Sequence, residues 1–392
     1  MSFSFRRVYA DAASAVPVTL RAFFVFFYVS MFLWGNPSSF HREGVRARRA
    51  LLKARARVAE ILEVRKEDVI FTSGATEANT LAVIGTYRAL RDSGHLPQNP
   101  TVIIGGGEHS SVRGAVEELA SLGVEVITIP LTSFGHIDQH LLAEAVTEHT
   151  FFVSFSLVQS EIGTIEPLRT LSRIVRKKAP EAVIHTDASQ APLWIPLSRA
   201  RLEADLITLD GQKIGAPRGI GTLIVGRFKI RNILYGGGQE SGRRPGTEPV
   251  ALAASFAQAL QDAQKNVSLR AKRIIAIRDG IYKKLHQTYP DIVVNGSMKE
   301  RVAHNLNIWI PGRDAEYLVA LLDRFGVSVS SRSACESVDE KGYSALGALP
   351  EGAERAYESL RITLLPTITR REARYITQAV IRAIQQFDTV NK

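Results

Sequence analysis

Short runs of hydrophobic residues recur between residues 69 and 225, and stretches of helical periodicity separate most of them. The runs are rich in Val, Ile, Phe and Thr, and several lack the polar–apolar alternation of a strand with one solvated face. Such strands are typical of a sheet that is covered by helices on both faces. We therefore expect an α/β fold with a mainly parallel, seven-stranded sheet. The predicted strands are 69–73, 101–106, 124–129, 151–157, 182–187, 205–210 and 221–225.

The pattern changes after Pro249. Residues 249–289 show a charged, helical periodicity, which predicts one long connecting helix. Because 392 residues exceed what one hydrophobic core usually spans, we expect two domains. We predict a large domain at 15–255 and a smaller α+β domain at 256–392, together with residues 1–14. The smaller domain is predicted to contain strands at 304–310, 326–330 and 359–364 and helices at 314–325 and 370–387.

Residues 22–34 are apolar on every side, and arginines precede them. The segment has 13 residues, whereas a membrane-spanning helix needs about 20. No small-residue cleavage site follows, since the next residues are Gly35, Asn36 and Pro37. A buried or interface helix is therefore predicted, rather than a membrane span or a targeting segment.

Composition narrows the class of protein. A hydrophobic content of 45% with 22% charged residues is ordinary for a soluble globular enzyme. The single cysteine, Cys335, excludes an internal disulfide and a cysteine-rich metal site, and it favours a reducing, cytoplasmic location. The net charge of +10 is partly due to a basic cluster at 41–57. A solvated helix face explains this cluster better than RNA or an acidic partner, so no stable nucleic-acid binding is expected.

Polar groups follow several of the predicted strands, at the edge of the sheet where ligands of open α/β sheets collect. Ala75 and Thr76 begin a helix directly after Gly74, and a helix N-terminus attracts phosphate. Asp187 ends a strand, with Gln190 three residues later. This pair could hold a protonated pyridine nitrogen and a ring hydroxyl, although a capping Asp is the commoner arrangement.

Three further side chains could carry chemistry. Lys213 lies in a Gly-rich loop between two strands, where it could form a Schiff base with an aldehyde, or else be an ordinary surface lysine. Arg361 lies in the middle of a predicted strand, where it could clamp a carboxylate or form a structural ion pair. Cys335 lies in a serine-rich loop, and it is either a nucleophile or a small packed hydrophobe.

Nine segments in order resemble the cysteine desulfurases, which are pyridoxal-phosphate (PLP) enzymes of the class V aminotransferase family and have PLP fold type I. The resemblance extends from about Tyr9 to the C-terminal helix. The segments are "GNPSSFHREG", "FTSGATEAN", "EHSSV", "SEIGTIEPL", "HTDASQ", "QKIGAPRGIGTL", "GGGQESGRRPGTEP", "SSRSACES" and "SLRIT".

The resemblance implies a role for each matching residue around the cofactor. Lys213 would bind PLP covalently, Asp187 would pair with the pyridine nitrogen, and Gln190 would bond the ring hydroxyl. His109 would stack on the ring and transfer protons. The residues implied for the phosphate are Ala75, Thr76 and, from the second subunit of a homodimer, Thr247.

The resemblance also implies the substrate and its sulfur acceptor. Arg361 would bind the carboxylate of L-cysteine, and Cys335 would take the sulfur as a persulfide while alanine is released. The 26 residues from Cys335 to Arg361 resemble the branch of the family with a long, mobile cysteine loop. Sulfur would then pass to an acceptor protein such as an iron–sulfur scaffold, or to the assembly of a thio-cofactor or thiolated RNA.

The match is weaker beside the predicted lysine. The family usually has Ser-Gly-His before it, whereas this chain has Asp210, Gly211 and Gln212. A carboxylate at 210 would repel a phosphate dianion unless it is protonated or paired. Ser160 stands where the family has an asparagine near the ring. We therefore expect weaker PLP binding than in a typical member.

Three functions remain open from the sequence. The first is a PLP-dependent L-cysteine desulfurase. The second is a relative that acts on selenocysteine or on another β-substituted amino acid. The third is a catalytically weakened homologue that serves as a dimeric scaffold. The complete set of predicted catalytic side chains favours the first.

Overall fold

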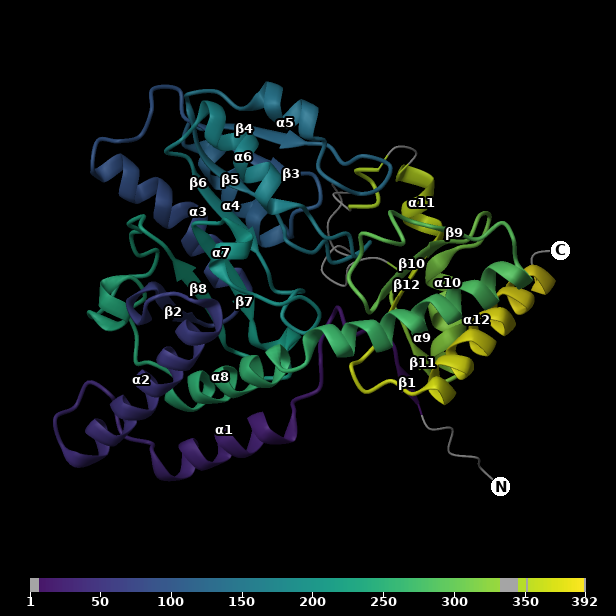
Figure 1. The fold of residues 1–392 in the computed structure, drawn as a ribbon, viewed down its shortest axis with the longest axis horizontal. Coiled ribbons are helices and arrows are strands. Elements are labelled where there is room, and N and C mark those ends of the chain that lie inside the picture. The colour runs from purple at the N-terminus through teal and green to yellow at the C-terminus, as the bar shows by residue number, and fades with distance from the viewer. Residues whose placement is uncertain (1–6, 332–344, 350–351, 391–392) are drawn as a thin grey trace.

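The computed structural model describes residues 7–331, 345–349 and 352–390. A seven-stranded sheet forms the larger part and is drawn on the left of Figure 1, with strand order β2-β8-β7-β6-β5-β3-β4. Strand β8 is antiparallel to both of its neighbours, and the other neighbouring pairs are parallel, so the predicted α/β fold is confirmed. The strands are β2 (Val69–Thr72), β3 (Thr101–Gly105), β4 (Glu125–Ile129), β5 (Thr150–Ser154), β6 (Val183–Asp187), β7 (Leu206–Asp210) and β8 (Gly221–Val225).

Both faces of this sheet are buried except at the edge strand β4, which explains why most of its strands lack polar alternation. Successive residues of one strand enter different hydrophobic clusters: Val183 belongs to the cluster that contains residues of α3 and α4, and Ile184 belongs to the other cluster. The helices around the sheet are α1 (Leu20–Phe32), α2 (Arg42–Leu62), α3 (Ala75–Asp92), α4 (Ser110–Ser121), α5 (Gln139–Ala145), α6 (Leu168–Lys178), α7 (Arg199–Leu202) and α8 (Val250–Gln264), and the short 3-10 helices are η1 (Lys66–Asp68), η2 (Gly211–Lys213) and η3 (Gln239–Gly242).

The C-terminal part of the chain forms smaller sheets, on the right of Figure 1. In one, β10 is antiparallel to both β9 and β12; in the other, β1 pairs with β11 in parallel. The three predicted strands and two predicted helices are found, whereas β1 and β9 are only two residues long and give no periodic signal. The elements are β1 (Val8–Tyr9), α9 (Val267–Thr288), β9 (Val293–Val294), β10 (Asn305–Trp309), α10 (Ala315–Arg324), β11 (Val327–Ser328), α11 (Gly352–Glu358), β12 (Ser359–Thr363) and α12 (Arg370–Val390).

The prediction of one long helix at 249–289 is wrong, because the segment is divided into α8 and α9. The helix is interrupted at Lys265, whose backbone is extended, and at Asn266, which has a left-handed φ of 52°. Asparagine is among the residues that adopt this conformation most readily. The periodicity continues through the break, so the pattern alone does not show it.

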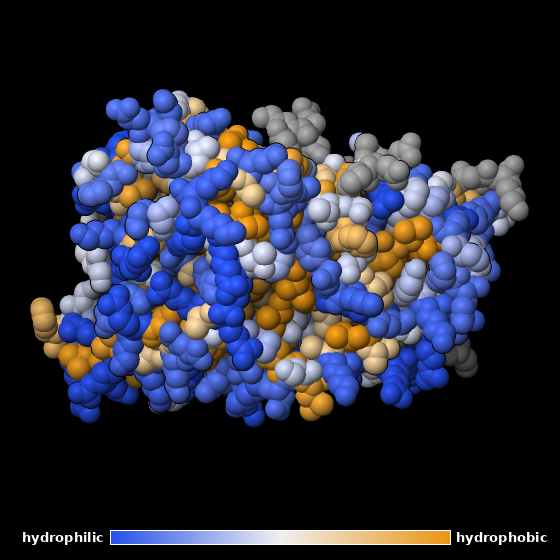
Figure 2. All heavy atoms as spheres, turned by 45° about the horizontal axis from the view of Figure 1, so that its top comes forward, coloured by the Kyte–Doolittle hydropathy of each residue, from blue (hydrophilic) through white to orange (hydrophobic). Residues whose placement is uncertain are grey.

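Helix α1 is mostly exposed in the single chain, so of the two predicted arrangements the buried helix is wrong and the interface helix stays a prediction. Its buried residues are Ala22 and Val29, and it packs along α8. Phe24 is 62% exposed and Phe27 is 51% exposed. No helix in the described part of the chain is long and apolar enough to cross a membrane. Most of the face shown in Figure 2 is hydrophilic, with separate smaller hydrophobic areas.

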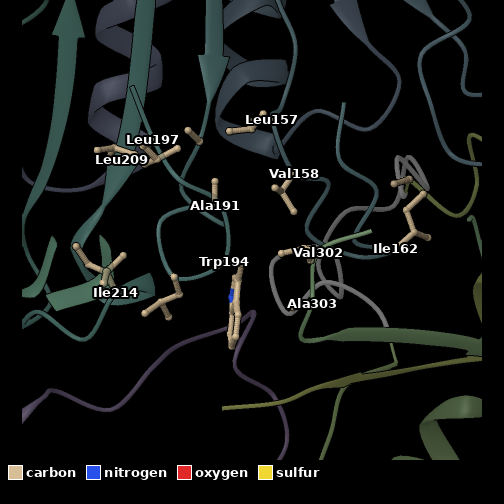
Figure 3. Close-up of a cluster of buried hydrophobic side chains, with 14 of the residues drawn as sticks. Leu157, Val158, Ile162, Ala191, Trp194, Leu197, Leu209, Ile214, Val302 and Ala303 are labelled. Carbon is tan, nitrogen blue, oxygen red and sulfur yellow. The ribbon is translucent and has the colours of Figure 1, made fainter. Parts of the chain in front are cut away.

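A buried cluster connects the loop after β6 with the segment before β10. Figure 3 shows side chains of this cluster, among them Trp194, Val302 and Ala303. The ring of Trp194 stacks on His304, with 4.6 Å between ring centroids. Burial lowers the pKa of His304 to about 3, so this ring is neutral in the core. The packing fixes the loop that carries Gln190 against the C-terminal part of the chain.

Candidate active site

A cavity of about 300 Å³ lies beyond the carboxyl ends of the central strands. It brings together every predicted site residue except Thr247 and Cys335. Thr247 lines a different pocket, beside the end of α1, and Cys335 lies outside the described residues. The cavity is lined by Ala13, Ser14, Ala75, Thr76, Gly107, His109, Ser156, Val158, Ser160, Asp187, Ser189, Gln190, Asp210, Gln212, Lys213 and Arg361.

Lys213 ends the 3-10 helix η2, which begins directly after β7. Its Nζ donates hydrogen bonds to the backbone oxygens of Ala13 at 2.8 Å and Ser14 at 2.7 Å. Gln190 donates to the same Ala13 oxygen at 2.9 Å. Residues 13 and 14 therefore close one side of the cavity and hold the lysine inside it, so Lys213 is not an ordinary surface lysine.

Asp187 is 9% exposed at the end of β6. Its Oδ1 accepts a hydrogen bond from the backbone N–H of Ser189 at 2.9 Å, which fixes the turn that follows. Its Oδ2 accepts a hydrogen bond from Asn79 at 2.8 Å. The next helix begins only after Ser198, so the carboxylate caps no helix and its two oxygens are held in a fixed orientation toward the cavity wall.

Asn79 connects Asp187 with His109, and no role was predicted for this residue from the sequence. It is fully buried on α3, and its Nδ2 also donates to the Ser111 hydroxyl at 2.9 Å. That hydroxyl lies 2.8 Å from Nδ1 of His109. The available signal was the spacing, because Asn79 follows Ala75 by four residues and so lies on the same face of the helix.

The His109 ring is fixed by the start of α4. The backbone N–H of Ser111 donates to Nδ1 at 3.1 Å, so the neutral ring carries its proton on Nε2. His109 is itself the N-cap residue of this helix. Capping therefore sets both the tautomer and the orientation of the ring at the cavity wall.

Asp210 and Gln212 bind each other. The carboxylate of Asp210 accepts one hydrogen bond from the backbone N–H of Gln212 and another from its side-chain amide, each at 3.1 Å. Burial raises the pKa of Asp210. The carboxyl group is thus paired, and one of the two N–H groups of the Gln212 amide is bound to it.

Arg361 is 2% exposed in β12 and combines the two arrangements that the sequence left open. It lines the cavity, and its guanidinium binds Asp11 at 3.0 Å, the Ser14 hydroxyl at 2.9 Å and the backbone oxygen of Ser160 at 3.3 Å. Its buried Nε has no hydrogen-bond partner among the described residues. An ion pair therefore holds a cation at the cavity wall.

His185 supports the sheet beneath the cavity. Its ring lies 2.8 Å from the Ser154 hydroxyl and 3.0 Å from the Thr208 hydroxyl, and it is fully buried. Burial lowers the pKa of this histidine, which outweighs the opposite effect of Asp187. The residue links β5, β6 and β7 at the level of the site.

Residues 11–373 match the family description "Aminotransferase class-V". The chain therefore belongs to the class-V aminotransferase family. Curated relatives include "Cysteine desulfurase IscS" of Dictyoglomus turgidum, 31% identical over 390 residues with 98% of this chain and 96% of the relative covered. "Cysteine desulfurase IscS 1" of Archaeoglobus fulgidus is 33% identical over 361 residues, with 91% of each chain covered. These matches place the chain among the cysteine desulfurases, as predicted.

Solved structures show the same fold. A chain described as a "NIFS-LIKE PROTEIN" superposes with a TM-score of 0.87 at 28% identity, covering 97% of this chain and 99% of that one. DndA from Streptomyces lividans superposes with a TM-score of 0.75 at 30% identity, covering 91% and 99%. The arrangement of the sheet and the surrounding helices is therefore shared with known members.

Proposed function

We propose that the protein is a PLP-dependent cysteine desulfurase that converts L-cysteine to L-alanine and leaves the sulfur on Cys335 as a persulfide. One observation carries this proposal: the amine of Lys213 and the carboxylate of Asp187 line the same cavity. An amine that reacts with an aldehyde and a carboxylate that pairs with a pyridinium are the two groups that PLP chemistry requires of its protein.

The residues of the cavity suit PLP. Lys213 would hold it covalently, Asp187 its pyridine nitrogen, and Gln190 its ring hydroxyl. The phosphate would lie at the start of α3, beside Ala75 and Thr76. The space there is open, because a Cβ atom added at the preceding Gly74 would meet no atom within 4 Å. When bound, PLP supplies an electron sink for charge that develops on the amino-acid substrate.

The chain's own groups supply the remaining functions. His109 would exchange protons through Nε2, because Nδ1 is bound by Ser111. Arg361 would bind the substrate carboxylate, although at present Asp11 and Ser14 occupy part of its guanidinium. The thiol of Cys335 would accept one sulfur atom from L-cysteine, so that a thiol becomes a persulfide and cysteine becomes alanine.

We propose that the active form is a homodimer in which Thr247 contributes to the partner's phosphate site. Two observations support this arrangement. Thr247 lies outside the cavity of its own chain, in a pocket that residues of α1 also line. The aromatic side chains of α1 are exposed in the single chain, and a second copy would cover them.

The domain division stays a proposal: 15–255, and 256–392 with 1–14. It is supported by the pairing of β1 with β11, which joins the start of the chain to the C-terminal part. A cytoplasmic location and transfer of the sulfur to a protein such as an iron–sulfur scaffold are proposed on the single cysteine and on the family.

One observation favours a second candidate function, the weakened homologue that acts as a scaffold. One N–H of the Gln212 amide is bound to Asp210, and Asp210 brings a carboxyl group, so the two side chains offer the phosphate fewer donors than the Ser and His that the family usually provides. The complete set of Lys213, Asp187, His109 and Arg361 in one cavity supports the enzyme more strongly.

The decisive experiment adds L-cysteine and PLP to the purified protein and measures alanine and the mass of Cys335. We expect alanine, a mass increase of one sulfur on that residue, and a yellow, borohydride-reducible chromophore. Lys213→Ala should lose the chromophore, whereas Cys335→Ser should keep it and form no persulfide. A wild-type protein that binds PLP but forms neither product would favour the scaffold. A parallel assay with selenocysteine tests the remaining alternative: alanine formed from selenocysteine but not from L-cysteine would favour the relative that acts on selenocysteine.

A further inference from the structure

We propose that a proton route leads from the active-site cavity to solvent. It passes through Ser156, the buried carboxyl groups of Glu108 and Glu166, and His136. This inference rests on the proposed function, because it assigns the route to proton exchange at that site. Glu108, Glu166 and His136 lie outside the residues that the family resemblance implied for catalysis.

Three cavities in series share their walls. The active-site cavity of about 300 Å³ and a small cavity of about 10 Å³ are both lined by Gly107 and Ser156. The small cavity and an outer pocket of about 680 Å³ are both lined by Ile137 and Glu166. The small cavity therefore lies between the site and the outer pocket, which contains His136.

Glu108 stands at the inner end of the route. It is 2% exposed, and its Oε2 lies 3.2 Å from the hydroxyl of Ser156, which also faces the active-site cavity. Its Oε1 is buried and has no hydrogen-bond partner among the described residues. This atom belongs to a side chain that lines the small cavity, whose size suits a single water molecule. A water there would satisfy it.

Glu166 and His136 form the outer end. Glu166 accepts a hydrogen bond from the backbone N–H of Ile137 at 3.1 Å, and its Oε2 lies 3.7 Å from Nδ1 of His136. The other ring nitrogen of His136 lies 3.1 Å from Glu300, which is exposed. A separation of 3.7 Å is too long for a hydrogen bond, and Nδ1 has no hydrogen-bond partner among the described residues, so the imidazole lies between a buried carboxyl group and one at the surface without yet bonding the buried one.

Burial favours protonated carboxyl groups along the route. Burial raises the pKa of Glu108 to about 8, and the nearby Asp187 adds to this effect, while Ser156 and Arg113 oppose it. Burial also raises the pKa of Glu166, against the effect of His136. The pKa of His136 is raised by Glu166 and Glu300. These shifts favour a proton on each of the three groups, and the remaining titratable residues of the outer pocket are Asp138 and His140.

Proton transfer along the route balances at every step. A proton that arrives on His136 from solvent would pass to Glu166 once side-chain rotation brings Nδ1 within hydrogen-bond distance, and a proton of Glu166 would pass to Glu108 through a water in the small cavity. Glu108 then donates to the oxygen of Ser156, whose own proton enters the active-site cavity. Each group gains one proton and loses one, so the route is ready again once the side chains have turned back.

The first test follows the route directly, without cofactor. The carbonyl stretching band of protonated carboxylic acids is measured by infrared spectroscopy in the apo protein, and Glu108→Gln should remove the part of the band that Glu108 contributes. On transfer to D₂O the band shifts as the acid exchanges its proton. We expect exchange to be about 10- to 100-fold slower in Glu166→Gln. The upper end of this range equals the smallest rate contribution that is typical of a positioned acid or base. The matched control is His140→Gln, which changes an exposed residue of the same outer pocket.

The second test uses turnover. Glu166→Gln should lower kcat for alanine formation and increase the solvent isotope effect with little change in KM, whereas His140→Gln should change neither. His136→Ala should lower kcat, and added imidazole should restore it, because the outer pocket is open to solutes at that position. A purely structural role would not be rescued by imidazole.

The outcomes separate this proposal from the proposed function. Equal exchange rates in wild type and Glu166→Gln, or a carboxylic band that is equally intense in wild type and Glu108→Gln, would overturn the route. A wild-type protein that forms no alanine would overturn the proposed function, while the exchange measurement still decides whether the route transfers protons.

Discussion

Asn79 donates a hydrogen bond of 2.8 Å to the carboxylate of Asp187, from a helix that is remote from it in sequence. Both side chains are buried, so the bond forms in a poorly solvated region where it is stronger than at the surface. The second hydrogen of the same amide group binds Ser111, which orients His109. One asparagine thus positions both of the groups proposed to face the cofactor ring.

Replacement of Asn79 by alanine should weaken PLP binding. A hydrogen bond to a charged group contributes about 1.5–3 kcal/mol, so we expect an increase in the Kd for PLP of roughly 10- to 100-fold. The measurement is a titration of the cofactor absorbance. Thr80→Ala is the control, because Thr80 bonds only to the backbone oxygen of Thr76 within the same helix. Equal affinities in Asn79→Ala and Thr80→Ala would contradict the role of Asn79.

Asp210→Ser should strengthen PLP binding, because it removes a carboxylate from the proposed phosphate site and releases the amide of Gln212. The pH dependence has a defined sign. Burial raises the pKa of Asp210, so the carboxyl group becomes charged as the pH rises through that pKa, and the affinity of the wild type should fall. Titrations at several pH values compare wild type, Asp210→Ser and Asp210→Asn. Identical affinities would show that the carboxyl group does not face the phosphate.

Arg361→Lys should raise the KM for L-cysteine by roughly 10- to 100-fold, since a lysine cannot reproduce a bidentate carboxylate contact. Asp11→Asn is the matched variant, because it removes the charge that holds the guanidinium at 3.0 Å. We expect it to leave KM unchanged or to lower it. Steady-state alanine formation checks both variants, and an equal rise in KM would indicate that the ion pair with Asp11 is only structural.

Glu108 should make the protein less stable at high pH. Its pKa is raised from 4.5 to about 8 by burial, so the folded protein keeps a proton that the unfolded chain releases. The stabilisation is complete below pH 4.5 and is lost as the pH rises through 8, by roughly 5 kcal/mol at most.

Urea unfolding at several pH values measures this effect. The free energy of unfolding of Glu108→Gln should depend less on pH than that of the wild type over this range. Glu117→Gln, which changes an exposed carboxylate of α4, should follow the wild type. If all three proteins show parallel curves, Glu108 is ionised in the folded state.

Phe27→Glu should convert the proposed dimer to a monomer, because a charge on the exposed face of α1 would have to be buried at the interface. The molar mass in solution, measured by light scattering, checks this outcome. Phe134→Glu is the control, since Phe134 is 62% exposed and lies outside α1. A dimer that tolerates Phe27→Glu as well as Phe134→Glu would place the interface elsewhere.

The large sheet could be predicted from the sequence because six of its seven strands, all except the edge strand β4, are buried on both faces and give continuous apolar runs. The break at Asn266 could not, because the periodicity of α8 and α9 is continuous across it. The site residues on strand ends were found from their place after a strand. Asn79 and Glu108 were missed, because what they do depends on burial and on partners that are distant in sequence.

The pairing of β1 with β11 has a mechanical consequence. Residues 8 and 9 are hydrogen-bonded to this ladder, and a few residues later the backbone oxygens of Ala13 and Ser14 grip the amine of Lys213. In the other direction β11 leads through Ser330, which pairs with Arg361, toward the segment that contains Cys335. A displacement of this short ladder would therefore move the backbone that binds the Lys213 amine and the backbone that pairs with Arg361 together, so the two cations at the cavity wall share one support.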